Sequence, residues 1–376
     1  MITLYIANLL YMCAFSAYFL LPVYLTDLGA TESLVGAIMS SMGVSNAITL
    51  IWIYFWGADH DTRRLILLGC IATSISCVAI LMTTHLFLIS AIRLLQGFAF
   101  CLYFVSLNTY LTEICPPSQH AKQIGFLGII TLTTQSAAPA AAEAFVALTS
   151  FPALFGLTVA FSVGATGVVM LLPVSGKKQG LKSTDLSVTS PEQPWLAYGL
   201  QISAVALLGG AAYGTVLIFS PLYLRAHGIL PLSLFFIAYA VAAIIARFVG
   251  RNWADRYGRV RVARICFIVL ALATLSLGWS TRMVTFTAAS ALFGVGHGLM
   301  YPAVAAYSIQ VIPGNLRAMT IWTGGFIIGV SAGAAGAGAI AEYTAIGTAF
   351  QFAALLPFAA CLLLLIQPGM KWYRYS

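Results

Sequence analysis

The sequence has 376 residues, of which 61% are hydrophobic and 7% are charged, and its formal net charge is +8. Soluble domains carry about 25% charged residues, so the few ionisable side chains here cannot cover a water-exposed surface of this size. The composition excludes a soluble enzyme, a disordered chain and a nucleic-acid-binding protein, and it predicts an all-α protein that crosses a membrane many times.

Apolar runs recur along the whole chain, and each is long enough to cross a bilayer as a helix. About 20 apolar residues span the hydrocarbon core, and helices satisfy their backbone polar groups within the segment. The first run lacks the basic start and cleavage site of a signal peptide, so it is expected to be retained. The twelve transmembrane helices expected from these runs lie at 3–26, 33–56, 65–83, 86–109, 124–146, 152–173, 196–224, 231–249, 263–280, 284–308, 318–340 and 347–367.

One long polar segment, 174–194, interrupts this pattern and is rich in Ser, Gly and Lys. It is interpreted as a linker between an N-terminal six-helix half, 1–173, and a C-terminal six-helix half, 195–376. The halves resemble each other, because PVYLTDLG at 22–29 and PLYLRAHG at 221–228 share Pro, Tyr, Leu and Gly at an offset of 199. Two pseudo-symmetric bundles of this kind are typical of transporters, which bind their substrate between the halves.

The basic residues predict the orientation. With a cytoplasmic N-terminus, fifteen of the eighteen Lys and Arg face the cytoplasm, Arg225 and Arg282 lie outside, and Arg93 lies within a span. The positive-inside rule therefore favours cytoplasmic N- and C-termini in a multi-pass protein of the cytoplasmic membrane.

Two polar turns carry a family signature. The turn after the eighth span reads GRNWADRYGRVRV, and the turn after the second reads FWGADHDTRR. The first resembles the G-x-L-A-D-R-x-G-R-R motif of the major facilitator superfamily, although its leading glycine is displaced by one position. The second turn is a degenerate copy. By this resemblance the gating residues are Asp59, Arg63, Arg64, Arg247, Asp255, Arg256 and Arg259.

Three further stretches support the resemblance. IRLLQG in the fourth span is similar to the R-x-x-Q-G element of proton-coupled members, and QSAAPAAAE in the fifth is similar to an exporter element whose glycines are alanines here. GVGHGLMYP in the tenth span is similar to a stretch in bacterial efflux permeases. The resemblance implies the twelve-helix fold of this superfamily and proton-coupled export, by alternating access, of a small organic solute such as a drug, metabolite or metallophore.

Three ionisable side chains within spans are candidates for proton coupling. Arg93 must find acceptors because a charge in the membrane is costly, and it either tunes an acid, binds an anionic group or organises hydrogen bonds. Glu143 is expected at a depth similar to Arg93, or else at the interface reaching water. His297 lies near mid-membrane between two glycines, where it either binds a proton or substrate or serves packing.

Other polar and aromatic side chains in the spans are expected to line a substrate cavity, since such cavities combine apolar walls with a few polar groups. These candidates are Tyr11, Tyr18, Asn46, Gln96, Tyr103, Gln135, Gln201, Tyr213, Tyr239, Tyr301 and Trp322. Asp27, Glu32 and Glu342 are expected to be exposed charges of outer turns, with Asp27 as a possible gate residue.

No phosphate-binding loop, zinc-protease motif or serine-hydrolase motif occurs in the sequence. The chain is therefore expected to act without a cofactor or metal, as a monomer in the bilayer, and not as an enzyme. Two alternatives stay open. One is a symporter or uniporter on the same fold, and the other is an intramembrane enzyme or lipid-handling protein that uses His297 and Glu143 as acid and base.

Overall fold

The computed structural model describes residues 1–56, 61–116, 120–173, 195–313 and 315–366, and these residues form helices and no strand. The N-terminal half consists of α1 (Ile2–Ala17), the 3-10 turn η1 (Tyr18–Leu20), α2 (Leu21–Asp27), α3 (Glu32–Trp56), α4 (Thr62–Leu81), α5 (Leu86–Ile114), α6 (His120–Leu148) and α7 (Phe151–Met170). The C-terminal half consists of α8 (Trp195–Ala226), α9 (Leu234–Val249), α10 (Trp253–Tyr257), α11 (Arg259–Trp279), α12 (Met283–Val311), α13 (Asn315–Tyr343) and α14 (Ile346–Leu363).

The helices begin and end at residues that suit their positions. Asp61 caps α4 by accepting a hydrogen bond from the backbone N–H of Arg63 at 3.0 Å, and Ser150 caps α7 in the same way. Gly29 and Gly228 follow α2 and α8 with φ angles of 84° and 65°, a conformation that favours glycine. These two glycines are 199 positions apart, so the structure repeats the turn where the sequence repeats.

Each predicted span corresponds to a helix of the structure. Within the described ranges, ten helices are long and apolar enough to cross a membrane, with η1 and α2 continuing α1 in the first of them. The other two predicted spans correspond to α9, a shorter apolar helix of 16 residues, and to α6, a helix of 29 residues that is not among those ten. The prediction of an all-α protein with two membrane-spanning bundles is confirmed. The boundary predicted at 174–194 lies outside the described residues and stays a prediction.

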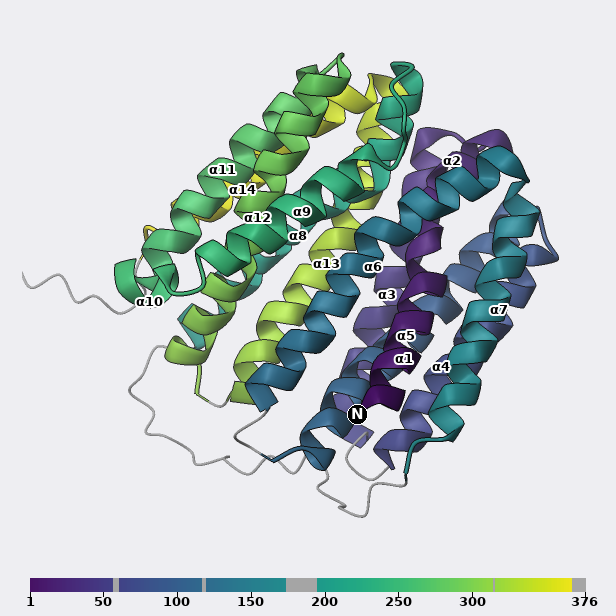
Figure 1. The fold of residues 1–376 in the computed structure, drawn as a ribbon. Helices are drawn as coiled ribbons and strands as arrows, with labels where there is room; N and C mark the ends of the chain where they lie inside the picture. Colours follow the sequence, from purple (N-terminus) through teal and green to yellow (C-terminus); the bar gives the residue numbers. More distant parts are fainter. Residues whose placement is uncertain (57–60, 117–119, 174–194, 314, 367–376) are drawn as a thin grey trace, which may run out of the picture.

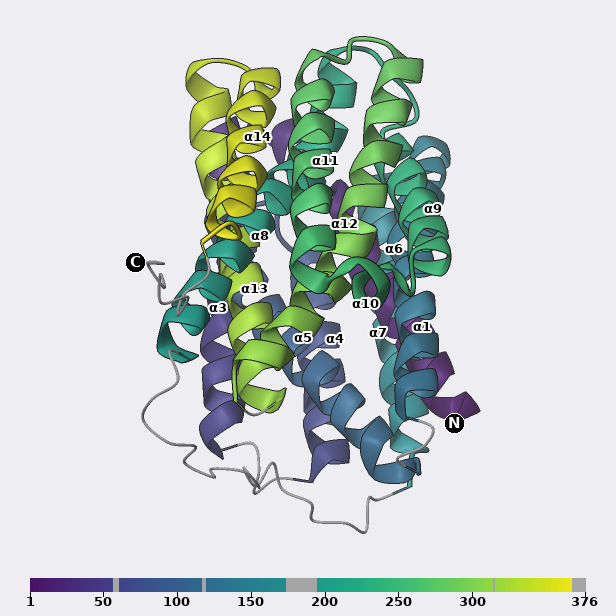
Figure 2. The same cartoon turned by 90° about the vertical axis from the view of Figure 1, so that its left-hand side faces the viewer.

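The two halves lie side by side along their length (Figure 1). Between them α3 packs on α13, α6 on α9, and α2 on α8, while α13 also packs on α8 of its own half. Figure 2, in which the C-terminal half faces the viewer, shows α11 between α12 and α14. We call the end at which α7 ends and α8 begins the linker end, and the opposite end, where α2 ends, the distal end.

Large apolar side chains cover much of the outer surface. Phe87, Leu200, Phe248 and Val284 are each at least 66% exposed. In water such a surface would be unfavourable, but lipid tails solvate it well. The exposed apolar side chains therefore agree with helices that face a bilayer.

Candidate functional site: a cavity between the halves

A cavity of about 850 Å³ lies between the two halves. Its wall begins near Phe19 in the distal part of the molecule and reaches Arg251 and Asp255, beside α10, at the linker end. In the distal direction the ring of Phe19 stacks on Phe236 of the other half, with centroids 5.2 Å apart. The cavity is thus approached from the linker end and covered at the distal end.

Arg93 contributes a buried charge to the N-terminal wall, where α5 positions it. The side chain is 4% exposed. It donates one hydrogen bond to Oε1 of Gln96 at 2.7 Å and contacts Sδ of Met42 at 3.1 Å, while its Nε has no partner. None of the ion pairs formed by described residues includes Arg93. A thioether is a weak acceptor, so the guanidinium has unused capacity to bind an anion.

Amides and a hydroxyl also contribute to the polar part of this wall. Asn8, on α1, is 1% exposed, lines the cavity and has no hydrogen-bond partner for either amide atom. Asn46 and Gln135 line the cavity as well, and Tyr18 lines it with its hydroxyl 3.0 Å from Oγ1 of Thr158. Such groups can orient a bound solute by hydrogen bonds.

The C-terminal wall carries a group of five rings, which we call the aromatic box: Tyr213, Tyr239, His297, Tyr301 and Phe326. The Tyr213 ring stacks on the imidazole of His297 with centroids 4.5 Å apart. Nδ1 of His297 is hydrogen-bonded to the hydroxyl of Tyr239 at 2.8 Å, and its Nε2 has no partner. Since Nδ1 is already bonded to Tyr239, Nε2 is the ring nitrogen that keeps unused hydrogen-bonding capacity.

Six of the predicted substrate-binding residues line this cavity: Tyr18, Asn46, Gln135, Tyr213, Tyr239 and Tyr301. The structure places the other five, Tyr11, Gln96, Tyr103, Gln201 and Trp322, outside the lining.

These five side chains have structural contacts instead. Tyr11 and Tyr103 stack on each other at 3.6 Å within the packed N-terminal half. Gln201 donates to backbone carbonyls at the end of α14, Gln96 accepts from Arg93, and Trp322 is fully buried behind Tyr301. The sequence alone could not separate these side chains from the lining ones, because both kinds are polar or aromatic residues within spans.

The predicted gating residues that the structure describes lie at the linker end, and their contacts stay within one half. Asp255 is 3.7 Å from Arg259, which also donates to the carbonyl of Ala306 at 2.9 Å. Gly258, between α10 and α11, has a φ angle of 93°, which explains a glycine at this place in the signature. The signature therefore fastens the start of α11 to the end of α12.

The remaining gating candidates also contact their own half. Arg247 donates to the carbonyl of Gly298 at 3.1 Å, and the guanidinium of Arg256 lies 5.3 Å from the Tyr257 ring centroid. Arg63 donates to the carbonyl of Met170 at 2.6 Å. Arg64 is 3.8 Å from Asp61, and Asp59 lies outside the described residues.

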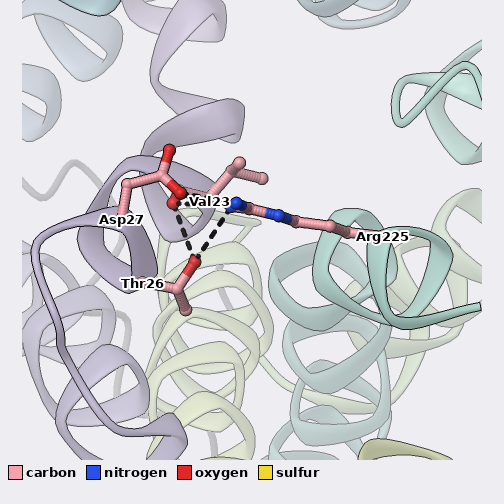
Figure 3. A network of polar contacts seen from close by, with 4 residues as sticks. All are labelled: Val23, Thr26, Asp27 and Arg225. Carbon is pink, nitrogen blue, oxygen red and sulfur yellow. Dashed lines mark hydrogen bonds and ion pairs between the residues drawn. The ribbon is translucent and has the colours of Figure 1, made fainter. Parts of the chain in front are cut away.

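An ion pair joins the two halves at the distal end. Nη2 of Arg225, at the end of α8, is 2.6 Å from Oδ1 of Asp27, at the end of α2 (Figure 3). The same guanidinium lies 3.4 Å from the carbonyl of Val23 and from Oγ1 of Thr26. Both charged side chains are partly exposed, at 47% and 39%, so the pair contributes at most about 1 kcal/mol. Asp27, expected as an exposed turn charge or a gate residue, joins the halves here.

Two carboxylates make further contacts between the halves at this end. Glu143 of α6 accepts hydrogen bonds from the backbone N–H groups of Leu232 and Ser233, just before α9, at 2.5 and 2.7 Å. Glu342 of α13 accepts from the backbone N–H of Ser33 at 3.0 Å. Glu143 was expected at a depth similar to that of Arg93. Its carboxylate is hydrogen-bonded at the distal end, at the start of a helix of the other half, whereas Arg93, which lines the cavity, is hydrogen-bonded to Gln96.

Glu342 and Arg225 were not recognised as contacts between the halves from the sequence. The signal that could have identified Glu342 is the repeat, since it lies 199 positions after Glu143. Phe236 and Phe326, which cover and line the cavity, had no signal beyond their aromatic rings.

Comparisons with known proteins agree with this arrangement. The family model described as Major Facilitator Superfamily matches residues 4–251 and 228–371, which is nearly the whole chain. The chain belongs to the major facilitator superfamily. It is accordingly a multi-pass membrane protein and a transporter of small solutes, which confirms the resemblance found in the sequence.

Bacterial relatives differ in their sequence identity to this chain and in the share of it that they match. The Staphylopine export protein of Staphylococcus aureus is 22% identical over 90% of this chain and 88% of its own length. An uncharacterised MFS-type transporter of Pseudomonas aeruginosa is 29% identical, but the match covers 39% of this chain and 37% of that protein.

Solved structures share the fold at low identity. The nucleoside transporter NupG superposes with a TM-score of 0.77 at 15% identity, covering 97% of this chain and 99% of that one. The human organic anion transporter MFSD10 gives a TM-score of 0.70 at 13% identity, with 96% and 98% coverage.

Proposed function

We propose that this protein is a secondary active transporter that exports a small organic solute from the cytoplasm in exchange for protons, by alternating access. One observation carries this proposal: the cavity lies between the two halves, is approached from the linker end and is covered at the distal end by contacts between the halves. Such a structure is one of the two states that alternating access requires.

The linker end faces the cytoplasm in this proposal. The bias of Lys and Arg toward that end supports the orientation, with both termini on the same side. The similarity to the Staphylopine export protein over 90% of the chain supports export. The protein is then loaded from the cytoplasm in the described state and releases its solute after the distal end opens.

Arg93, Glu143 and His297 are the proposed coupling groups, and they occupy two different places. Arg93 and His297 line the cavity from opposite halves, whereas Glu143 holds the distal end closed. Protonation of the Glu143 carboxylate would remove an acceptor from the contact between the halves and so favour opening. This separation also favours transport over acid–base catalysis by Glu143 and His297, since a catalytic pair must reach one substrate.

The proposal keeps the expectation from the sequence that the protein acts without a metal or a cofactor. Among the described residues, no group of three or more His, Cys, Asp and Glu side chains is placed to hold a metal. We propose that the transporter acts as a monomer in the cytoplasmic membrane without a cofactor.

The test is proton movement driven by solute in liposomes that contain the purified protein and an internal pH dye. A panel of drugs, sugars and metal-chelating metabolites is added with and without an imposed pH gradient. The proposal expects at least one solute to move protons in the opposite direction, and Glu143→Gln to reduce that movement strongly. Flux that ignores the pH gradient would contradict proton coupling, and co-directional flux would indicate a symporter.

A further inference from the structure

We infer that the solute is an organic anion, with an acidic group bound by Arg93 and a planar ring bound by the aromatic box. This inference rests on the proposed function and adds the chemical class of the substrate. It starts from the charges of the cavity wall: among the described residues that line the cavity, three are arginines, Arg93, Arg247 and Arg251, and one is acidic, Asp255. A solute with a negative charge is attracted to such a wall, and a cation is repelled.

The contacts of Arg93 locate the acidic group. A buried guanidinium stays charged, and burial without an anionic partner is costly. In the described part of the chain, its partners are the neutral Gln96 and Met42, and its Nε has none. A carboxylate in the cavity would supply the missing charge and accept two parallel hydrogen bonds from the guanidinium.

The aromatic box locates the planar part. Its rings come from α8, α9, α12 and α13 and stand around His297, whose Nε2 is unpartnered. Tyr213 has one face on His297, and the rings of the box together give the cavity an apolar aromatic wall, on which a flat ring of a solute can pack with a gain from apolar burial and ring geometry. Asn8, with two free amide atoms on the opposite wall, can bind a polar substituent.

Three indole compounds with the same ring test this assignment: indole-3-acetate, indole-3-acetamide and tryptamine. Binding to the purified full-length protein is measured by calorimetry in detergent. We expect the carboxylate to bind at least tenfold more tightly than the neutral amide, and the amine to bind most weakly. Arg93→Gln, which retains hydrogen-bonding groups but not the charge, should reduce the carboxylate-to-amide ratio to about one. Arg93→Lys should keep a ratio above one.

Tyr213→Leu provides the matched test of the box. This substitution should weaken the binding of indole-3-acetate and of indole-3-acetamide by the same factor and leave the ratio of their affinities unchanged. Circular dichroism and size-exclusion chromatography establish that each variant is folded. Equal binding of all three compounds, absence of binding by the whole series, or an unchanged ratio in Arg93→Gln would overturn the assignment. Proton-coupled flux of a neutral or cationic solute would leave the proposed function standing and remove only the substrate class.

A separate observation concerns the closure of the distal end. Glu143 and Glu342 are 199 positions apart, and so are their backbone partners Ser33 and Leu232. Each carboxylate therefore caps the start of the equivalent helix in the other half, α9 or α3. We propose that these two pseudo-symmetric carboxylate caps act together to hold the distal end closed, because a carboxylate at a helix N-terminus is stabilised by free N–H groups and by the helix dipole.

Distance measurements between spin labels test the two caps. Labels at Leu148→Cys and Val284→Cys lie at exposed distal positions, one in each half, in a background without native cysteines. Glu143→Gln and Glu342→Gln should each increase the population with a longer distance about threefold, and the double variant about tenfold, as independent contacts would. The control is Glu32→Gln, which removes a carboxylate at the same end and should change the population with a longer distance little. An unchanged distribution in the double variant would refute the caps.

Discussion

Arg93, Gln96 and Gly97 act as one unit on α5. Gln96 holds the guanidinium by a hydrogen bond of 2.7 Å. A Cβ at position 97 would lie 1.9 Å from the carbonyl oxygen of Met42, so glycine is what allows α3 to come this close. The same residue, Met42, then reaches Arg93 with its sulfur. The R-x-x-Q-G element thus presents a charge to the cavity with its orientation set by neighbours.

A methyl group at position 97 is expected to disturb this unit. Gly97→Ala should push α3 away from α5 and lower the free energy of unfolding by about 1–3 kcal/mol, the usual effect of overpacking. The substitution should also weaken the binding of indole-3-acetate relative to that of indole-3-acetamide, because Arg93 loses its orientation.

Thermal unfolding in detergent and calorimetry measure both effects. Gly167→Ala is the control, since a Cβ there has no atom within 4 Å. Equal stability of the two variants would contradict the packing described for Gly97.

At the scale of elements, α13 is the helix on which both halves depend. Gly329 and Gly333 would place a Cβ 2.2 and 2.0 Å from carbonyl oxygens of α8 in the same half. Gly338 would place one 2.5 Å from the carbonyl of Glu32 on α3, in the other half. One stripe of small residues therefore fastens α13 to its own bundle, and another lets it approach the partner bundle at the distal end.

This division predicts different results for two glycines of the same helix. Gly338→Ala should separate α13 from α3 and weaken the Glu342 cap, which raises the population with a long distal distance severalfold. Gly333→Ala should instead lower the unfolding temperature, because α8 and α13 belong to one rigid half.

The spin-label pair at the distal end and a thermal unfolding assay distinguish these outcomes. Gly336→Ala on the same helix is the control, because a Cβ there meets nothing within 4 Å. The division would be wrong if Gly338→Ala destabilised the fold without any change at the distal end.

The sequence predicts elements better than contacts, and the reason is physical. Membrane spans are long apolar runs, so hydropathy alone located every helix from α1 to α14 except the short α10. Contacts such as Asp27 with Arg225 join residues almost 200 positions apart, and no local pattern encodes them. The site shows the same limit: Arg93 was identified because a charge in an apolar run is conspicuous, whereas Tyr11 and Tyr213 look alike in sequence but lie in a packed core and in the cavity wall.

At the scale of the whole molecule, the proposed alternating access requires the halves to move relative to each other as rigid bodies. If they rock about the cavity, the distal end must open as the linker end closes. A second spin-label pair, Leu171→Cys and Tyr257→Cys, lies at exposed positions of the linker end, one in each half. The linker-end distance should therefore shorten in every molecule whose distal distance lengthens.

Double electron–electron resonance on both pairs in liposomes checks this relation. The Glu143→Gln, Glu342→Gln double variant should lengthen the distal distance and shorten the linker-end distance in equal proportions of the population. Glu32→Gln should leave both distributions as they are. If the distal distance lengthened while the linker-end distance stayed constant or grew, the halves would be separating rather than rocking, and alternating access through this cavity would be refuted.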